Sequence, residues 1–445
     1  MKGWPRPAAA SPALSRWRAL LRERRFQQLL AARLTSQAAD GVFQASLASA
    51  VFFNPEHHAS AARVASGFVV LLLPYSLVGP FAGVFLDRWR RQRVLVYGAL
   101  VRSLVVAVAA ALLARQGPAG LGFEVAALAA LSINRFYLAD LGASLPSILT
   151  DRLLVAGNAL SPTAGTVATI AGGGIGLGLR ELAGRGSGAD AVACLVAAVG
   201  YVVAALLALR LPAESLGPAV RNQAPLRRQL AGTVRGLVAG ADHIRRLPSA
   251  AAGLGMICGQ RLLFGVWSIM ALLLYRNHFH DAGLLRAGIV GFGQAVAAGG
   301  IGFVIAAAVA PVAAARFGLR RWIVIVTGFL AVAELVLGLE FALAPLLVAA
   351  LATGFATQST KICVDTLLQE QVSDEFRGRA FAFYDTVFNA SFVAAAVVAA
   401  VSLPATGTST VAVVLIAAGY AVLALGYSSA ASTVASGPAA RRAGP

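Results

Sequence analysis

The sequence predicts an all-α membrane protein with twelve transmembrane helices arranged as two six-helix bundles. Of its 445 residues, 58% are hydrophobic and only 13% are charged, whereas a soluble domain carries about 25% charged residues. A helix needs about 20 apolar residues to cross a bilayer, and twelve stretches of the sequence meet that length. These stretches lack the alternation of barrel strands, and a helix pairs all its backbone groups internally, so helices are favoured over a β-barrel.

The expected spans follow one another through short loops, except at the middle of the chain. They cover approximately residues 27–53, 64–86, 94–114, 122–146, 158–180, 190–210, 249–275, 285–310, 322–341, 346–370, 381–403 and 410–430. The resulting organisation is a tail (1–26), a six-helix bundle (27–210), a central loop (211–248), a second six-helix bundle (249–430) and a second tail (431–445).

The basic charge of the chain indicates its topology in the membrane. The formal net charge is +18, and with an even number of spans most of the 37 Lys and Arg residues fall on the side that holds both termini. Such a bias marks the cytoplasmic side of a membrane protein. We therefore expect cytoplasmic N- and C-termini, the lipid bilayer as a partner, and no nucleic acid.

The central loop contains a further helix signal. Between Pro225 and Arg246 the apolar residues recur at helical spacing, and the arginines mostly lie off that stripe. The pattern predicts an amphipathic helix on the inner leaflet, held by apolar burial and by anionic lipid. Its role is either to tether the two bundles or to regulate them.

A short basic turn between the second and third spans carries the most informative motif. It reads Gly-Val-Phe-Leu-Asp-Arg-Trp-Arg-Arg-Gln-Arg over residues 83–93. It resembles the loop between helices 2 and 3 of the major facilitator superfamily, whose pattern is roughly G-x-x-x-D-R-x-G-R-R/K. The residues at matching positions are Gly83, Asp87, Arg88 and Arg91, whereas Arg90 and Gln92 depart from the pattern. A partial copy over residues 315–321 favours two related halves.

Two further segments, residues 151–160 and 374–380, are similar to bacterial exporters of this superfamily related to macrolide-efflux and siderophore-export proteins. The resemblance implies alternating access in a bacterial cytoplasmic membrane. It also implies a lock between the cytoplasmic ends of the two halves, formed by Gly83, Asp87, Arg88, Arg91, Arg377, Arg379 and Asp385. The alternative for Asp87 and Asp385 is ordinary charge that sets topology.

Charged residues inside the expected spans predict a water-accessible cavity. A charge at the bilayer centre costs about 2.5–3.5 kcal/mol on insertion scales, so it needs a partner or water. Most of these charges lie in spans 1, 4, 7 and 10, which line the central cavity in the superfamily. The predicted cavity for substrate and protons comprises Arg33, Gln37, Asp40 and Gln44 of span 1, Arg135 and Asp140 of span 4, Arg261 of span 7, and Lys361 and Asp365 of span 10.

Asp40 is the candidate proton carrier, because a buried carboxylate near a cation such as Arg33 can exchange a proton for a substrate. The alternative is a permanent ion pair between Asp40 and an arginine of another helix. Arg102 and Glu334 belong to spans expected at the periphery, so we expect structural pairing for both.

Lys361 is one of only two lysines in the chain, which indicates a need for a compact, titratable ammonium group. The alternative is an ion pair with Asp365, four residues on, that only makes the helix insertable. Arg135 and Arg261 are interpreted as ligands for an anionic substrate group or as counter-ions.

Glycines are concentrated in spans 5 and 8. Gly172 with Gly176, and Gly174 with Gly178, are GxxxG pairs that allow close helix approach. We expect these two spans to meet at the interface between the halves.

The leading functional hypothesis is a proton-coupled exporter of an amphipathic small molecule. Alternatives are a flippase for lipid or envelope precursors, an uptake porter, and a non-transporting receptor or scaffold on the same fold. No nucleotide-binding motif, metal-ligand pattern or catalytic set stands out, so we expect neither an enzyme nor a cofactor. We expect a monomer.

Overall fold

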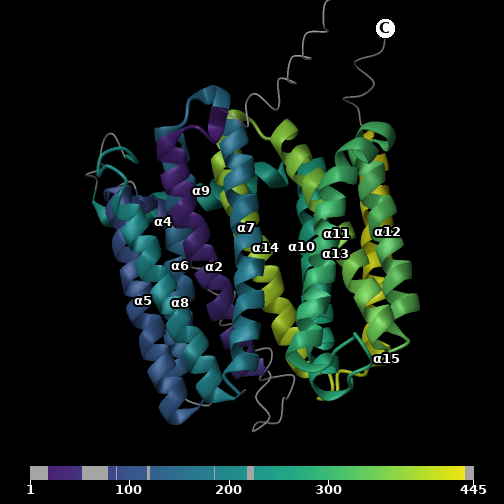
Figure 1. The fold of residues 1–445 in the computed structure, drawn as a ribbon. Coiled ribbons are helices and arrows are strands. Elements are labelled where there is room, and N and C mark those ends of the chain that lie inside the picture. The colour runs from purple at the N-terminus through teal and green to yellow at the C-terminus, as the bar shows by residue number, and fades with distance from the viewer. Residues whose placement is uncertain are drawn as a thin grey trace, which may run out of the picture. The chain divides into compact units, whose positions relative to one another are not determined.

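The computed structural model describes residues 19–52, 79–86, 88–117, 121–184, 186–217 and 225–435. The regular elements within these ranges are thirteen helices (Figure 1). They are α2 (Arg24–Phe52), α4 (Gly79–Leu86), α5 (Arg91–Gln116), α6 (Leu121–Ile148), α7 (Asp151–Leu182), α8 (Ser187–Leu209), α9 (Leu226–Arg245), α10 (Pro248–Asn277), α11 (Gly288–Phe317), α12 (Leu319–Gly338), α13 (Leu343–Gln371), α14 (Asp374–Ser402) and α15 (Thr410–Ala435).

Eleven of the expected spans are long helices in the structure. The twelfth, residues 64–86, lies mostly outside the described residues, and α4 is its last part. In the described part of the chain, nine helices are long and apolar enough to cross a membrane, namely α5, α6, α8 and α10 to α15. The helices α2 and α7 are equally long but less apolar, because polar side chains interrupt them.

The chain divides into two compact units. Unit 1 comprises residues 1–50 and 82–225, and unit 2 comprises residues 51–81 and 226–445. The division at residue 225 falls within the expected central loop, 211–248. The other expected domain boundaries stay predictions.

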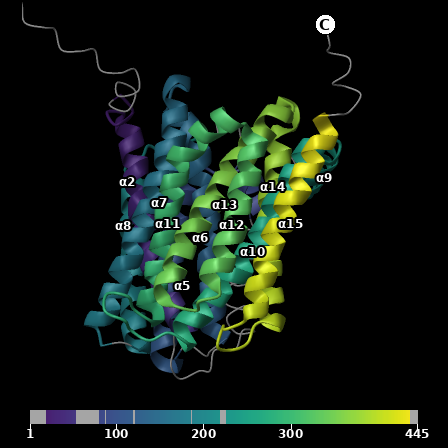
Figure 2. The same ribbon diagram turned by 90° about the vertical axis from the view of Figure 1, so that its right-hand side faces the viewer.

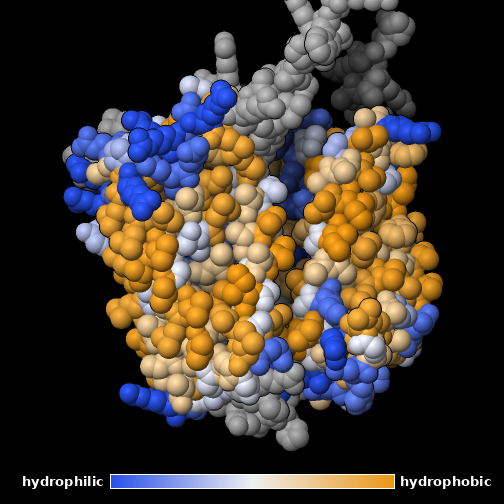
Figure 3. Space-filling model, in the orientation of Figure 1, coloured by the Kyte–Doolittle hydropathy of each residue, from blue (hydrophilic) through white to orange (hydrophobic). Residues whose placement is uncertain are grey.

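Apolar side chains cover the outer surfaces of these helices. Exposed large residues include Leu104 on α5 and Val332 on α12, which are 66% and 63% exposed. Figure 3 shows apolar residues over the middle of the helices and hydrophilic residues near their ends. Such a surface suits a lipid surrounding, in which the outer face needs no polar groups.

Each unit has its own packed core. In unit 1, Leu29 of α2, Leu95 of α5 and Leu145 of α6 are almost fully buried in one cluster. In unit 2, Ile323 of α12 and Val364 of α13 belong to a second cluster. There α11 lies beside α13 and α12 beside α15 (Figure 2).

The expected amphipathic helix is α9, and it packs on unit 2. The Ile244 side chain is 2% exposed, and the His243 ring stacks on Phe376 of α14 with ring centroids 4.5 Å apart. Gly240 contacts the backbone of Arg379, so a larger residue would not fit there. The C-terminal half of α9 is therefore a packed part of the unit, whereas Val238 remains 63% exposed.

The partial repeat of the basic motif differs in backbone conformation between its two copies. Gly318, between α11 and α12, has φ +83, a value that favours glycine. Arg90 stands where the pattern has glycine, and its φ of −66 lies in the extended region. An arginine therefore fits there without backbone strain.

The glycines of α7 and α11 serve contacts inside the units. A Cβ at Gly172 would overlap the Ala38 carbonyl oxygen of α2, and a Cβ at Gly176 would crowd Val42 of the same helix. A Cβ at Gly302 of α11 would overlap the Leu351 carbonyl oxygen of α13. The expected close approach is confirmed, but these glycines make it within each unit. Gly174 and Gly178 have no such neighbour within 4 Å among the described residues.

Candidate functional site

A buried polar cluster joins four helices of unit 1. Asp40 of α2 forms an ion pair with Arg102 of α5, and the Tyr201 hydroxyl of α8 donates a hydrogen bond of 2.8 Å to Asp40 Oδ1. Arg102 Nη1 donates to Asn134 Oδ1 of α6 at 2.8 Å. The pair is therefore neutralised and hydrogen-bonded by groups from the surrounding helices.

This cluster is closed. The side chains of Arg102 and Asp40 are 1% and 5% exposed, and the Arg102 guanidinium lies 3.9 Å from the Tyr201 ring centroid and 5.5 Å from that of Tyr137. Two buried charges remain stable only with such complete pairing. The geometry matches the alternative interpretation of Asp40, a lasting ion pair between helices.

Arg33 does not serve as the partner of Asp40. Its Nε donates to Gln37 Oε1 at 2.8 Å, and its Nη1 donates to Ser161 Oγ of α7 at 3.0 Å. Gln37 Nε2 lies 3.5 Å from Thr169 Oγ1, also on α7. The first half of the predicted polar stripe therefore binds α2 to α7, while Gln44 lies half-buried further along α2.

Asp140 lies near Arg91, a residue of the predicted lock. Its side chain is fully buried on α6, and the cation that acts on it is Arg91 of α5. Among the described residues, neither carboxylate oxygen of Asp140 has a hydrogen-bond partner. Arg91 Nη1 also donates to the backbone oxygens of Ala143, at 2.7 Å, and Leu216, at 3.1 Å. Arg91 therefore ties the start of α5 to α6 and to the segment after α8.

The other predicted lock residues are only partly described. Asp87 lies outside the described residues, and for Gly83 and Arg377 the structure describes only their place in a helix. Arg379 is exposed, with its guanidinium 5.4 Å from the Phe376 ring centroid, and Asp385 is exposed on α14. Arg135 lies half-buried on α6.

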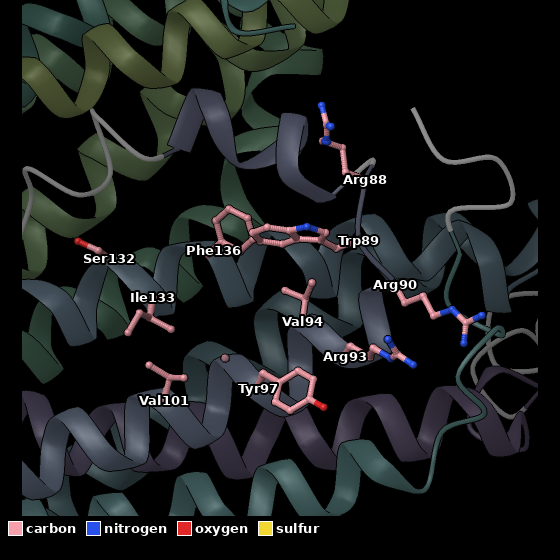
Figure 4. Close-up of a pocket in the computed structure, with 11 residues that line it drawn as sticks. Arg88, Trp89, Arg90, Arg93, Val94, Tyr97, Val101, Ser132, Ile133 and Phe136 are labelled. Carbon is pink, nitrogen blue, oxygen red and sulfur yellow. The ribbon is translucent and has the colours of Figure 1, made fainter. Parts of the chain in front are cut away.

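Arg88 lines a groove of about 610 Å³ on unit 1. Figure 4 shows Arg90 and Arg93 at one end, Val101 and Ile133 at the other, and Trp89 beside Phe136 between them. The last two rings have centroids 6.1 Å apart. The residues that line it are Arg88, Trp89, Arg90, Arg93, Val94, Tyr97, Gly98, Val101, Ser132, Ile133 and Phe136. None of the predicted cavity residues is among them.

A second ion pair lies in unit 2 and is open. Lys361 Nζ donates to Asp365 Oδ2 at 2.7 Å, one turn further along α13. The two side chains are 35% and 28% exposed. Lys361 Nζ also lies 3.4 Å from the Tyr384 hydroxyl of α14. The predicted i,i+4 pair is thus present, with part of each side chain accessible.

Arg261 of α10 lies beside this pair in an aromatic cage. Its guanidinium carbon is 5.3 Å from the Phe264 ring centroid, 4.5 Å from that of Phe388 and 4.7 Å from that of Phe392. Lys361 Nζ lies 6.0 Å from the same Phe388 centroid. Phe388 therefore contacts both cations, and we call Arg261, Lys361, Asp365, Tyr384, Phe388 and Phe392 the cation–aromatic cluster.

The aromatic members of this cluster were not predicted. A signal was available, because Tyr384, Phe388 and Phe392 step by four and so share one face of α14. Nearby, Gln260 Nε2 donates to Thr360 Oγ1 at 3.3 Å. Glu334 of α12 is fully buried and accepts a hydrogen bond from Thr353 of α13, and it forms no ion pair within the described chain.

The sequence and the fold both have known relatives. The chain is 34% identical over 396 residues to an uncharacterized MFS-type transporter of Mycobacterium bovis and, equally, to one of Mycobacterium tuberculosis. Each alignment covers 88% of this chain and 88% of the relative. No family model matches the chain.

Solved transporters share its architecture. The nucleoside transporter NupG is similar with a TM-score of 0.63 at 14% identity, covering 92% of this chain and 99% of that chain. A POT family transporter in complex with a thioalcohol-conjugated peptide has a TM-score of 0.69 at 11% identity, covering 92% and 96%. The inward-open xylose transporter XylE from E. coli has a TM-score of 0.61 at 12% identity, covering 90% and 94%.

These similarities at low identity show the fold, and the mycobacterial relatives show the family. They agree with the basic motif and with the long apolar helices of both units. The chain is a multi-pass membrane protein that belongs to the major facilitator superfamily of transporters.

Proposed function

We propose that this transporter is a proton-coupled exporter of an amphipathic small molecule that works by alternating access, and that the cation–aromatic cluster of unit 2 is its substrate and proton site. The observation that carries the proposal is the Lys361–Asp365 pair, which lies within a spanning helix and is about one third exposed. A pair that served packing alone would be closed, as Asp40–Arg102 is.

The pair can act as a switch. If a substrate group takes the Lys361 ammonium, Asp365 loses its counter-ion, and in this proposal a proton replaces it. If the substrate leaves, the pair forms again and the proton is released. Binding of substrate and of proton are thereby linked through one side chain.

The remaining predicted residues have supporting roles in this proposal. Asp40 with Arg102 holds four helices of unit 1 together, and Arg33 with Gln37 holds α2 to α7. Arg91 and Asp140 belong to the cytoplasmic lock. The proposed setting is a bacterial cytoplasmic membrane with both termini inside, supported by the distribution of Lys and Arg.

Proton flux into proteoliposomes with an imposed pH gradient tests the proposal. Cationic, anionic and lipid-like compounds are added in turn, with Asp365→Asn and Lys361→Ala as test variants. Asp242→Asn is the matched control, because it removes the exposed ion pair that Asp242 of α9 forms with Arg246. We expect one class of compound to trigger flux that both test variants lose and the control keeps.

Other outcomes would favour the alternatives. Movement of labelled lipid between leaflets, with no flux from small molecules, would favour a flippase. Compound uptake without proton movement would favour an uncoupled porter. Folded protein that moves nothing, with Lys361→Ala unchanged in phenotype, would favour a receptor or scaffold.

A further inference from the structure

We infer that the substrate is an organic anion with an apolar body, whose acid group binds between Arg261 and Lys361 while its body lies along the aromatic face of α14. This inference rests on the proposed function, because it names the class of substrate for the same cluster. Three observations support it. Arg261 forms no ion pair among the described residues, the Phe388 ring contacts both Arg261 and Lys361, and the aromatic side chains of α14 recur every four residues.

Arg261 is a cation without an anion. Within the described chain its guanidinium contacts three phenyl rings and forms no ion pair, and its buried Nε has no hydrogen-bond partner. Contacts with aromatic faces offset part of the cost of a charge within the membrane, but they give the buried Nε no hydrogen-bond acceptor. An anionic ligand would supply the missing partner.

The Lys361 ammonium has one hydrogen left for a ligand. It has three hydrogens, of which one reaches Asp365 at 2.7 Å and one the Tyr384 hydroxyl at 3.4 Å. Lys361 Nζ and the Arg261 guanidinium lie 6.0 Å and 4.5 Å from the centroid of the same Phe388 ring, and the inference places the acid group beside this ring, where both cations would donate to it. The flat donor edge of a guanidinium suits a carboxylate or phosphate particularly well.

The acidic groups around the cluster do not remove this preference. Asp365 Oδ2 is engaged by Lys361, its buried Oδ1 has no hydrogen-bond partner within the described chain, and Asp385, next to Tyr384 on α14, is exposed. An incoming cation would meet both Arg261 and Lys361 at close range. An incoming anion would meet two cations and one carboxylate that is already paired with Lys361.

The apolar side of the site is the stripe of Tyr384, Phe388 and Phe392. These side chains step by four along α14, so their rings line one face over about 12 Å of helix rise. Phe388 is half-buried, whereas Tyr384 and Phe392 are 1% and 4% exposed and support it from either side. A ring or short alkyl chain attached to the acid group can lie against the accessible part of Phe388, and a bare inorganic anion would leave it unused.

Compounds that share an apolar body but differ in their polar group test the inference. Each of three bodies, phenyl, naphthyl and octyl, is offered as a carboxylate, an alcohol and an amine. Thermal stabilisation of the purified protein reports binding, and counterflow of the radiolabelled compounds in proteoliposomes reports transport. Arg261→Gln removes the proposed anion ligand, Arg261→Lys keeps its charge, and Arg286→Gln removes a charge from an exposed pair with Asp281 as the matched control.

We expect the carboxylate of at least one body to bind more than tenfold more tightly than its alcohol and amine. Hydrogen bonds to charged groups contribute about 1.5–3 kcal/mol each, so Arg261→Gln should weaken carboxylate binding by roughly tenfold or more. Arg261→Lys should retain part of the affinity, and Arg286→Gln all of it.

The two claims fail in different ways. If an amine or alcohol is bound and transported as well as the carboxylate, transport stands and the anion site is wrong. If the carboxylate binds in an Arg261-dependent way but does not move, the anion site stands and transport by this site is wrong. If folded protein binds no carboxylate of the three bodies, or binds it equally in Arg261→Gln, the inference is overturned.

Discussion

The two units each contain an ion pair within their spanning helices, but the pairs differ in their access to solvent. In unit 1 the side chains of Arg102 and Asp40 are 1% and 5% exposed, and in unit 2 those of Lys361 and Asp365 are 35% and 28% exposed. The first pair joins helices distant in sequence, whereas the second lies on one helix at i,i+4. A buried charge is thus evidence of function only when its surroundings are known.

The chemistry around the pairs explains the difference. Asp40 and Arg102 have their remaining hydrogen-bonding groups satisfied by Tyr201 and Asn134, so neither charge has use for a ligand. Lys361 keeps an unused hydrogen, and its neighbour Arg261 forms no ion pair with any residue that the structure describes. One unit has used its charges in packing, and the other has left them available.

The largest expected effect is loss of the closed pair. Arg102→Leu leaves the Asp40 carboxylate buried without its cation, and breaking a buried pair in this way costs about 3–5 kcal/mol. We expect a strong fall in the yield of folded protein and in Tm, measured by thermal unfolding in detergent. The double variant Asp40→Leu with Arg102→Leu should recover much of the loss, because both charges are then gone. A single variant with wild-type Tm would show that the pair does not hold unit 1 together.

The second effect compares helix contacts of the two units. Gly172→Ala places a methyl group on the Ala38 carbonyl oxygen, and Gly302→Ala does the same against Leu351. Overpacking of this kind costs roughly 1–3 kcal/mol, so Tm should fall for both. Gly174→Ala is the control, because nothing lies within 4 Å of its added Cβ. Equal Tm values for Gly172→Ala and Gly174→Ala would contradict the close α2–α7 contact.

The sequence predicts features that lie on a single helix and misses contacts between side chains of two helices. The apolar runs predict the spans closely, as for α10, expected at 249–275 and observed at Pro248–Asn277. The Lys361–Asp365 pair follows from spacing alone. The partner of Asp40 does not, because Arg33 is seven residues away on the same helix and Arg102 is on another, and only the rotation of packed helices decides between them.

The same limit explains the other differences. Asp140 lies in span 4 with the predicted cavity, and the cation that acts on it, Arg91, belongs to another helix, which helical spacing does not predict. The cage around Arg261 combines Phe264 of α10 with two residues of α14. A stripe of aromatic residues every four positions predicts a buried face, and does not reveal which cation it meets.

The open pair should matter little for stability and greatly for transport. A half-exposed pair contributes about 0–1 kcal/mol, so Lys361→Ala and Asp365→Asn should each keep a Tm within a few degrees of the wild type. Substrate-dependent proton flux should fall to background in both. If Tm falls as far as in Arg102→Leu, the open pair is a packing device like the closed one, and the contrast between the units disappears.

The smallest expected effect concerns an ion pair on α9, outside the spans. It adds a third, more exposed pair to the comparison of the closed and open pairs. Asp242 on α9 lies 2.5 Å from Arg246 and 3.1 Å from Arg245, and the hydrogen bond from Arg246 lowers the pKa of the Asp242 carboxyl. A lowered pKa in the folded state stabilises the protein above the unfolded value of about 3.9, and this contribution is lost as pH falls through the folded pKa. Asp242→Asn should therefore lower Tm slightly at pH 6, with the difference from the wild type shrinking toward pH 3. Because the side chains of Arg245 and Arg246 are 83% and 76% exposed, the loss of Tm should be smaller than for either pair within the spans. A Tm loss in Asp242→Asn as large as that in Arg102→Leu would show that burial is not what distinguishes the pairs, and would remove the reason for assigning packing to one unit and transport to the other.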